Sequence, residues 1–261
     1  MEIAEHIDAL RDQGGLLADA AERAGLDAAV PTCPSWLVKD LLRHTGYIHR
    51  WAASHITDCA PSILDGPSEA EILLGGAPDP ELLGWFRAGH AALVATLATA
   101  DPAVECATFM PAPSPLAFWA RRQAHETAIH RADAETASGV RPEYAPGFAA
   151  DGIDELIMGF GQRRKYQSAA GPADGGLRVR ATDTGDAWHL SAGEGRIQAH
   201  RGPGEPPGPA DGPADGIVSG PASGVYLFLW NRSGADEAGV TIEGDPSFLA
   251  CWQSSVRVRW G

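Results

Sequence analysis

Cysteine is scarce in this sequence, and the cysteines present do not have the spacing of a thiolate metal site. The 261 residues include four, Cys33, Cys59, Cys106 and Cys251, and no two of them form a C-x-x-C pair. Zinc ribbons and dithiol redox sites depend on that spacing. We therefore expect neither a disulfide framework nor an all-thiolate metal site, and we expect reduced cysteines in a cytoplasmic protein.

Positive charge is also in short supply. Twenty Lys and Arg residues stand against 34 Asp and Glu residues, so the formal net charge is −14. Nucleic acids and anionic membrane surfaces are bound by cationic faces. The composition therefore argues against both as main partners, although it does not exclude a local basic pocket.

Long hydrophobic runs are missing as well. No stretch approaches the roughly 20 apolar residues that cross a bilayer, and the N-terminus, MEIAEHIDALRDQGG, carries acids in place of the apolar core of a signal peptide. We expect no membrane association. Hydrophobic residues still make up 44% of the chain, which supports a sizeable core, and the length predicts two domains.

The first 142 residues follow helical periodicity. Apolar residues recur at spacings of three and four, and Pro, Gly and Asp residues separate the periodic stretches. The Gly14-Gly15 pair weakens the first stretch and could bend it. Helices are predicted at residues 2–24, 36–59, 79–100 and 115–137, with a short helical turn at 69–74. Such helices bury their apolar faces as a four-helix bundle, which we assign to residues 1–142.

The composition changes after Gly139, and residues 143–261 are expected to form a small α+β domain. A helix is predicted first, and short alternating runs with Gly and Asp turns then indicate an antiparallel meander. The Pro- and Gly-rich stretch 202–216 is expected to be an exposed loop. The predicted elements are a helix at 148–167, strands at 177–182, 187–191 and 196–200, a helix at 220–231, a strand at 239–245 and a helix at 246–255. The predicted fold class is α+β.

A candidate metal site lies on two of the predicted bundle helices. Glu126 and His130 are four residues apart and share a helix face, and His44 falls on the apolar stripe of the second helix, whereas His49 and His55 look more peripheral. A His₂Glu set leaves a coordination position open, as in catalytic zinc sites, for water or a thiol. The alternatives are a solvated or buried Glu–His pair and a core histidine.

Longer motifs around these residues resemble the actinobacterial mycothiol-dependent maleylpyruvate isomerase family. The first two, VPTCPSWLVKDLLRHTGYIHRWA and RRQAHETAIHRADAE, include the three candidate ligands, and the last two, GPASGVYLFLWNR and VTIEGDPSFLACW, lie in the second domain. The resemblance implies a DinB-like four-helix bundle followed by a sterol-carrier-like α+β domain. It implies zinc held by His44, Glu126 and His130, with mycothiol as thiol cosubstrate. The implied chemistry is addition of the metal-bound thiolate to a small electrophilic acid, leading to isomerisation or S-transfer.

This chemistry would benefit from a cation that holds the substrate carboxylate. Arg121, Arg122 and Arg232 are the candidates, and we assign the catalytic role to Arg232. Arg122 and Trp51 are expected to contribute to binding of the thiol cosubstrate, and Trp36 could line the same pocket. Surface salt bridges and core packing are the structural alternatives for these residues.

Two other functions remain open at this point. One is a metal-dependent hydrolase with zinc-bound water, for which Asp40 or Asp133 could supply a base. The other is a non-catalytic protein that binds a lipid or another small molecule through its C-terminal domain. His₂Glu ligation also admits iron or nickel in place of zinc. The sequence leaves the substrate and the choice between monomer and homodimer undecided.

Overall fold

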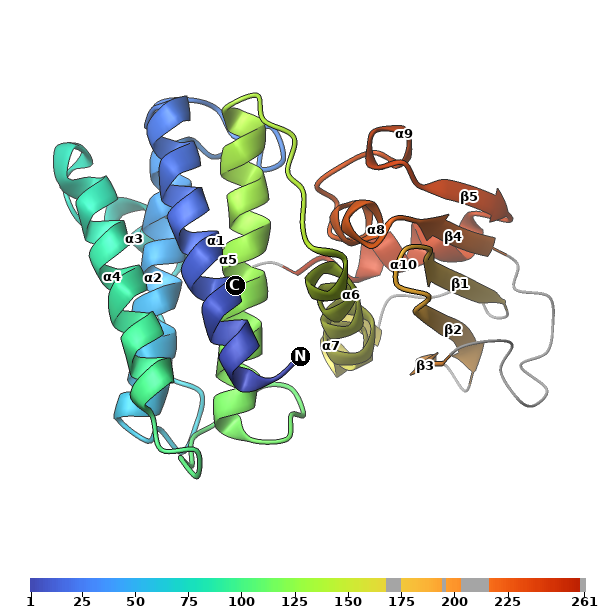
Figure 1. The fold of residues 1–261 in the computed structure, drawn as a ribbon, viewed down its shortest axis with the longest axis horizontal. Coiled ribbons are helices and arrows are strands. Elements are labelled where there is room, and N and C mark those ends of the chain that lie inside the picture. Colours follow the sequence, from blue (N-terminus) through green and yellow to red (C-terminus); the bar gives the residue numbers. More distant parts are fainter. Residues whose placement is uncertain (168–174, 194–195, 203–215, 259–261) are drawn as a thin grey trace. The chain divides into compact units, whose positions relative to one another are not determined.

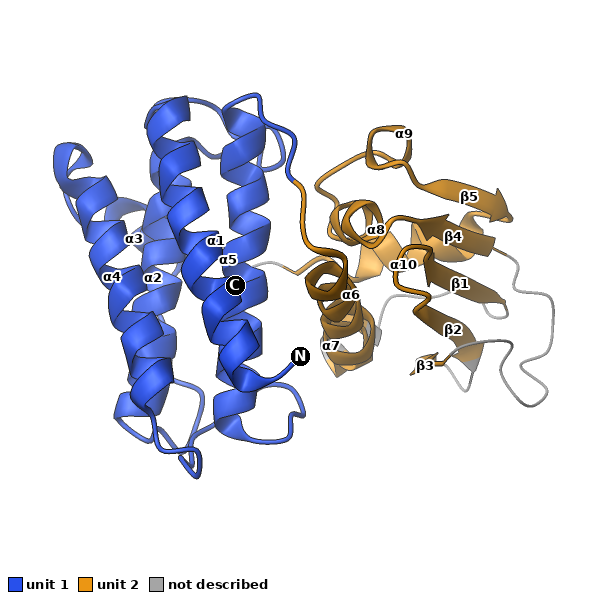
Figure 2. Cartoon of the chain, viewed as in Figure 1, with its two compact units in different colours: residues 1–142, 260–261 blue, residues 143–259 orange. Residues whose placement is uncertain are grey.

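The computed structural model describes residues 1–167, 175–193, 196–202 and 216–258. The chain divides into two compact units, Met1–Pro142 and Glu143–Arg259 (Figure 2). The first is helical, and the second combines helices with a mixed five-stranded sheet (Figure 1). The predicted α+β class is therefore confirmed. None of the helices in the described ranges is both long and apolar enough to cross a membrane.

Four long helices form the first unit. Each packs against two others: α1 contacts α4 and α5, and α2 contacts the same two helices. The short helix α3 lies in the connection from α2 to α4, which allows these neighbours to run in the same direction. The bounds are α1 Ile3–Ala24, α2 Val38–Thr57, α3 Glu69–Leu74, α4 Leu82–Thr99 and α5 Pro115–Ala137.

Local sequence signals account for the ends of these helices. Gly25 ends α1 with φ +83°, a conformation that suits glycine. Ser114 caps α5 by accepting a hydrogen bond from the Ala117 N–H, and Pro115 occupies the first turn. Helix α1 runs unbroken through Gly14, whose missing side chain leaves room for the ring of His90 on α4.

The helix predicted at residues 148–167 is broken in the structure, so that prediction is wrong in its extent. Helix α6 covers Pro146–Asp154, a π-helical turn follows at Glu155–Gly159, and a 3₁₀ turn at Phe160–Gln162 leads into α7, Arg164–Gln167. The sequence MGFGQ places two glycines here, and glycine is a poor former of regular helix.

The sheet of the second unit has the order β3-β2-β1-β4-β5. Strands β1 to β3 form the predicted antiparallel meander, and β4 adds to β1 in parallel. Strand β4 was not predicted, because it directly follows the Pro- and Gly-rich stretch, of which residues 203–215 lie outside the described residues. The remaining bounds are β1 Gly176–Ala181, β2 Ala187–Gly193, β3 Arg196–Arg201, β4 Gly216–Gly220, α8 Ala222–Leu229, α9 Ala235–Ala238, β5 Thr241–Gly244 and α10 Ser247–Ser255.

Candidate metal centre

The three side chains proposed as ligands lie together inside the bundle. His44 comes from α2, and Glu126 and His130 come from successive turns of α5. The Nε2 atom of His44 lies 3.5 Å from Oε1 of Glu126, and Nε2 of His130 lies 3.2 Å from the same oxygen. One ligand atom from each residue falls within 4.8 Å of the other two.

This arrangement fits a zinc ion. Zinc bonds to nitrogen and oxygen are about 2.0–2.1 Å long, so tetrahedral ligand atoms lie about 3.3 Å apart. The two nitrogen–oxygen distances, 3.2 and 3.5 Å, bracket that value. His44 and His130 are buried and Glu126 is partly exposed. If these three residues bound a tetrahedral zinc ion, its fourth position would be open to an exogenous molecule.

The electrostatics of the cluster favour a negative Glu126. Although burial raises the pKa of this carboxyl, hydrogen bonds from His130 and His44 and the charge of Arg122 hold its pKa well below the usual value. Burial lowers the pKa of His44. Burial also lowers the pKa of His130, but its hydrogen bonds to Asp133 and Glu126 outweigh that effect and raise the pKa to about 9. At neutral pH the metal-free cluster thus combines a negative Glu126 with a protonated His130 and a neutral His44.

A second carboxylate supports His130 from the far side of its ring. Nδ1 of His130 lies 2.9 Å from Oδ2 of Asp133, which is fully buried. This contact turns Nε2 toward Glu126. From the sequence, Asp133, like Asp40, was expected as a possible base of a hydrolase. Asp40 instead accepts the Leu37 N–H at the start of α2.

An aromatic side chain covers the two histidines. The ring of Trp36 lies 4.9 Å from that of His44 and stacks on that of His130 at 6.1 Å, measured between ring centroids. Its indole N–H donates to Oε1 of Glu69 at 3.1 Å. Glu69 was not among the predicted site residues. The position of this residue at the start of a predicted turn, in a loop next to the site helices, was the signal available.

Arg122 and Trp51, the two residues predicted to bind the thiol cosubstrate, have different neighbours. Arg122 is buried, and its Nη2 lies 3.0 Å from Oε2 of Glu126. Trp51 lies two turns beyond His44 on α2, packs against His55 and Trp119, and donates to the Leu64 carbonyl.

Arg232 belongs to the second unit and follows α8. Its Nη1 donates to the Trp230 carbonyl at 2.9 Å. The binding and catalytic roles of Arg122, Trp51 and Arg232 stay predictions.

His49 and His55 are not peripheral, contrary to the sequence-based expectation. Both are fully buried. Nε2 of His49 lies 2.8 Å from Oγ1 of Thr127, and His55 hydrogen bonds to the Trp51 carbonyl and the Leu64 N–H. The apolar stripe of α2 is wider than the periodicity suggested, because α4 and α5 both pack against it.

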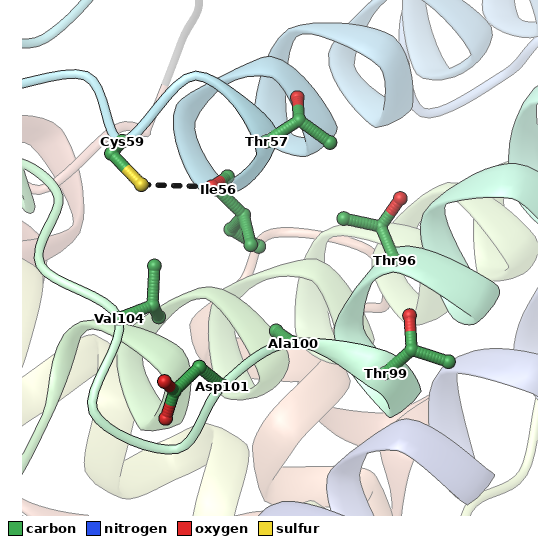
Figure 3. A pocket seen from close by; sticks show the side chains of 8 residues that line it. All are labelled: Ile56, Thr57, Cys59, Thr96, Thr99, Ala100, Asp101 and Val104. Carbon is green, nitrogen blue, oxygen red and sulfur yellow. Dashed lines mark hydrogen bonds between the residues drawn. The ribbon is translucent and has the colours of Figure 1, made fainter.

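A surface hollow of about 290 Å³ lies elsewhere on the bundle, where α2 and α4 end (Figure 3). Ile56 and Cys59 line it on one side, and Thr99 and Asp101 line it on the other. Ile56 follows His44 by twelve residues of continuous helix, which is about 18 Å. The hollow is therefore separate from the candidate metal centre.

Comparisons with known proteins identify relatives of this architecture. The family model of the mycothiol maleylpyruvate isomerase N-terminal domain matches residues 7–135. A crystal structure of the mycothiol-dependent maleylpyruvate isomerase is 16% identical with a TM-score of 0.64, and that of a histidine-to-alanine mutant is 15% identical with a TM-score of 0.67. Each match covers 94% of this chain and 95% of the other.

A search of curated proteins gave no match. At these identities the two crystal structures show a common fold. The family model spans His44, Glu126 and His130, so the matched segment holds all three candidate ligands. Residues 7–135 of this chain therefore belong to the family of the mycothiol maleylpyruvate isomerase N-terminal domain.

Proposed function

We propose that this protein is a zinc-dependent enzyme that uses mycothiol to isomerise a small electrophilic acid similar to maleylpyruvate. The observation that carries the proposal is the convergence of two imidazole Nε2 atoms on one oxygen of Glu126, at 3.2 and 3.5 Å, inside a bundle of this family. The solved relatives are titled mycothiol-dependent maleylpyruvate isomerase, which supports the choice of thiol and substrate class.

The protein residues prepare the site for a thiol. A zinc ion held by His44, Glu126 and His130 would lower the pKa of a thiol in its open position and keep it as thiolate at neutral pH. Glu126 supplies the negative charge among the ligands, and the ion pair with Arg122 fixes its second oxygen. The ring of Trp36 shields both imidazoles from water on one side.

Cis–trans isomerisation needs a nucleophile that adds to the double bond, allows rotation and then leaves. Holding the substrate's carboxylate would keep the molecule in place during that rotation. We assign this role to Arg232, and binding of the thiol to Arg122 and Trp51. If the adduct is released with the thiol attached, the reaction is S-transfer, and the product distinguishes the two outcomes.

Metal analysis tests the proposal. We expect about one zinc per purified chain and its loss in His44→Ala and His130→Ala, because each variant removes one of three protein ligands. His200→Ala, which changes an exposed histidine of β3, serves as the control and should retain zinc. Calorimetry should detect mycothiol binding in the wild type and in His200→Ala, and not in His44→Ala or His130→Ala. A folded wild-type protein that binds neither zinc nor mycothiol would contradict the proposal.

The same series separates chemistry from metal binding. Arg232→Ala should keep its zinc and bind mycothiol, yet isomerise maleylpyruvate at least tenfold more slowly, since a lost charge-assisted hydrogen bond is worth roughly 1.5–3 kcal/mol. Arg180→Ala, an exposed arginine of β1, is the matched control. Equal rates in both variants would remove Arg232 from the mechanism and leave the zinc assignment intact.

A further inference from the structure

We propose that Asp133 is a positioning residue of the metal centre and that the loop at residues 30–36 holds Asp133 in place through Thr32. The inference rests on the proposed function, because it concerns how the bundle presents His130 to the metal. It assigns a physical role to the VPTCPSW motif, none of whose residues is a candidate ligand.

The geometry at His130 points to this role. Oδ2 of Asp133 lies 2.9 Å from Nδ1 of His130. A proton on Nδ1 leaves the lone pair of Nε2 free, and Nε2 is the atom that faces Glu126. Histidines that bind metals commonly donate their other ring N–H to a carboxylate, which fixes the tautomer and the orientation of the ring.

Asp133 is a fully buried carboxylate. Its side chain has no exposed surface, and a buried carboxylate is costly unless hydrogen bonds compensate for lost hydration. Thr32 supplies one from the loop: its Oγ1 donates to Oδ1 of Asp133 at 2.5 Å. The Sγ of Cys33 lies 3.9 Å from Oδ2. Both oxygens of Asp133 thus have contacts with the loop. These contacts fix the orientation of the carboxylate that lies next to Nδ1 of His130.

The loop itself is held by its own backbone. The Val30 N–H donates to the Trp36 carbonyl, the Trp36 N–H donates to the Cys33 carbonyl, and the Cys33 N–H donates to the Val30 carbonyl. A bridge between Ala29 and Leu37 closes its base. Thr32 and Trp36 therefore reach the metal centre from one fixed segment, Thr32 through Asp133 and Trp36 through the imidazole rings.

Zinc affinity, measured by competition with a chromophoric chelator, tests the inference on the full-length protein. We expect Asp133→Asn to bind zinc about 10–100-fold more weakly than wild type. Thr32→Val should weaken binding by a smaller factor. In the double variant, loss of Thr32 should add little, because Thr32 acts through the carboxylate that is already gone. Thr108→Val, which removes a loop hydroxyl bonded to the Met110 carbonyl, is the matched control and should bind as wild type.

Two further readouts separate positioning from a loss of folding. Circular dichroism and thermal melting of the metal-free variants report folding alone, and Thr32→Val provides a mild change should Asp133→Asn fold poorly. The visible spectrum of the Co²⁺-loaded proteins should change in Asp133→Asn and stay unchanged in Thr108→Val, because it reports ligand geometry. Wild-type zinc affinity and an unchanged Co²⁺ spectrum in folded Asp133→Asn would overturn the inference alone. Absence of zinc from the wild type would overturn the proposed function as well.

Discussion

Histidine is concentrated in the interior of the first unit, where every histidine is buried. Burial lowers the pKa of three that lie outside the candidate metal centre, His49, His55 and His90. These rings remain neutral in the folded protein at a pH where the unfolded chain, with histidine pKa values near 6.5, already binds protons. Acid therefore lowers the stability of the folded bundle through these individual histidines.

The lowered pKa values of these histidines determine whether the free energy of unfolding rises or falls with pH. Above pH ~6.5 both states hold these rings neutral, and they contribute no pH dependence. As the pH falls below that value, the unfolded state takes up protons that the folded state does not. Each such ring then lowers the free energy of unfolding by up to about 1.4 kcal/mol per pH unit.

We predict that His90→Gln in metal-free protein flattens the fall in stability between pH 6.5 and 5, because it removes one of these rings. Denaturant midpoints measured at several pH values check this. His200→Gln changes an exposed ring of the second unit and should leave the slope as it is. Parallel curves for wild type and His90→Gln would show that His90 is protonated in the folded state at that pH.

At the scale of elements, the contact between α1 and α4 depends on a glycine that the sequence marks as a weakness. A Cβ at Gly14 would overlap the buried ring of His90, which packs against Phe86 and His49, whereas a Cβ at Gly15 would meet no atom within 4 Å. The two neighbouring glycines thus have opposite roles in one helix.

This difference predicts opposite effects of the same substitution. Gly15→Ala should raise the free energy of unfolding by about 0.5–1 kcal/mol, because alanine is the better helix former. Gly14→Ala should lower it by about 1–2 kcal/mol, since overpacking in a core outweighs that gain. Urea unfolding of both variants checks the prediction. A stabilised Gly14→Ala would mean that His90 moves aside at little cost.

For the whole molecule, the candidate metal centre and Arg232 belong to different units of the chain. His44, Glu126, His130 and Asp133 all belong to Met1–Pro142, and this unit has its own buried core around Leu17, Leu41 and Phe86. The candidate ligands and the carboxylate that supports His130 therefore all come from this unit.

We predict that residues 1–142, expressed alone, fold cooperatively and hold about one zinc, because the ligands, their support and the core lie within that fragment. The fragment should lack isomerase activity if Arg232 contributes to the reaction. Circular dichroism, metal analysis and an activity assay check these outcomes, with the fragment 143–261 as the zinc-free control. A fragment 1–142 that aggregates or lacks zinc would show that the bundle depends on the second unit.

The sequence by itself determined the helices of the bundle, the meander and the pairing of Glu126 with His130. These features are local: helical periodicity, a cap at Ser114 and Gly or Asp turns act within a few residues of one another. The sequence did not predict β4, because this strand follows a stretch without periodicity. It also predicted one continuous helix at residues 148–167, where two glycines interrupt the helix.

The tertiary structure alone decided which partners meet across the chain. Thr32 and Asp133 are separated by 101 positions, and no periodicity relates the path of a loop to the face of a distant helix. The same applies to Trp36 over the imidazoles and to the burial of His49 and His55, which depends on how many helices pack against α2. Contacts of this kind depend on the packing of complete elements, whereas short-range patterns specify each element by itself.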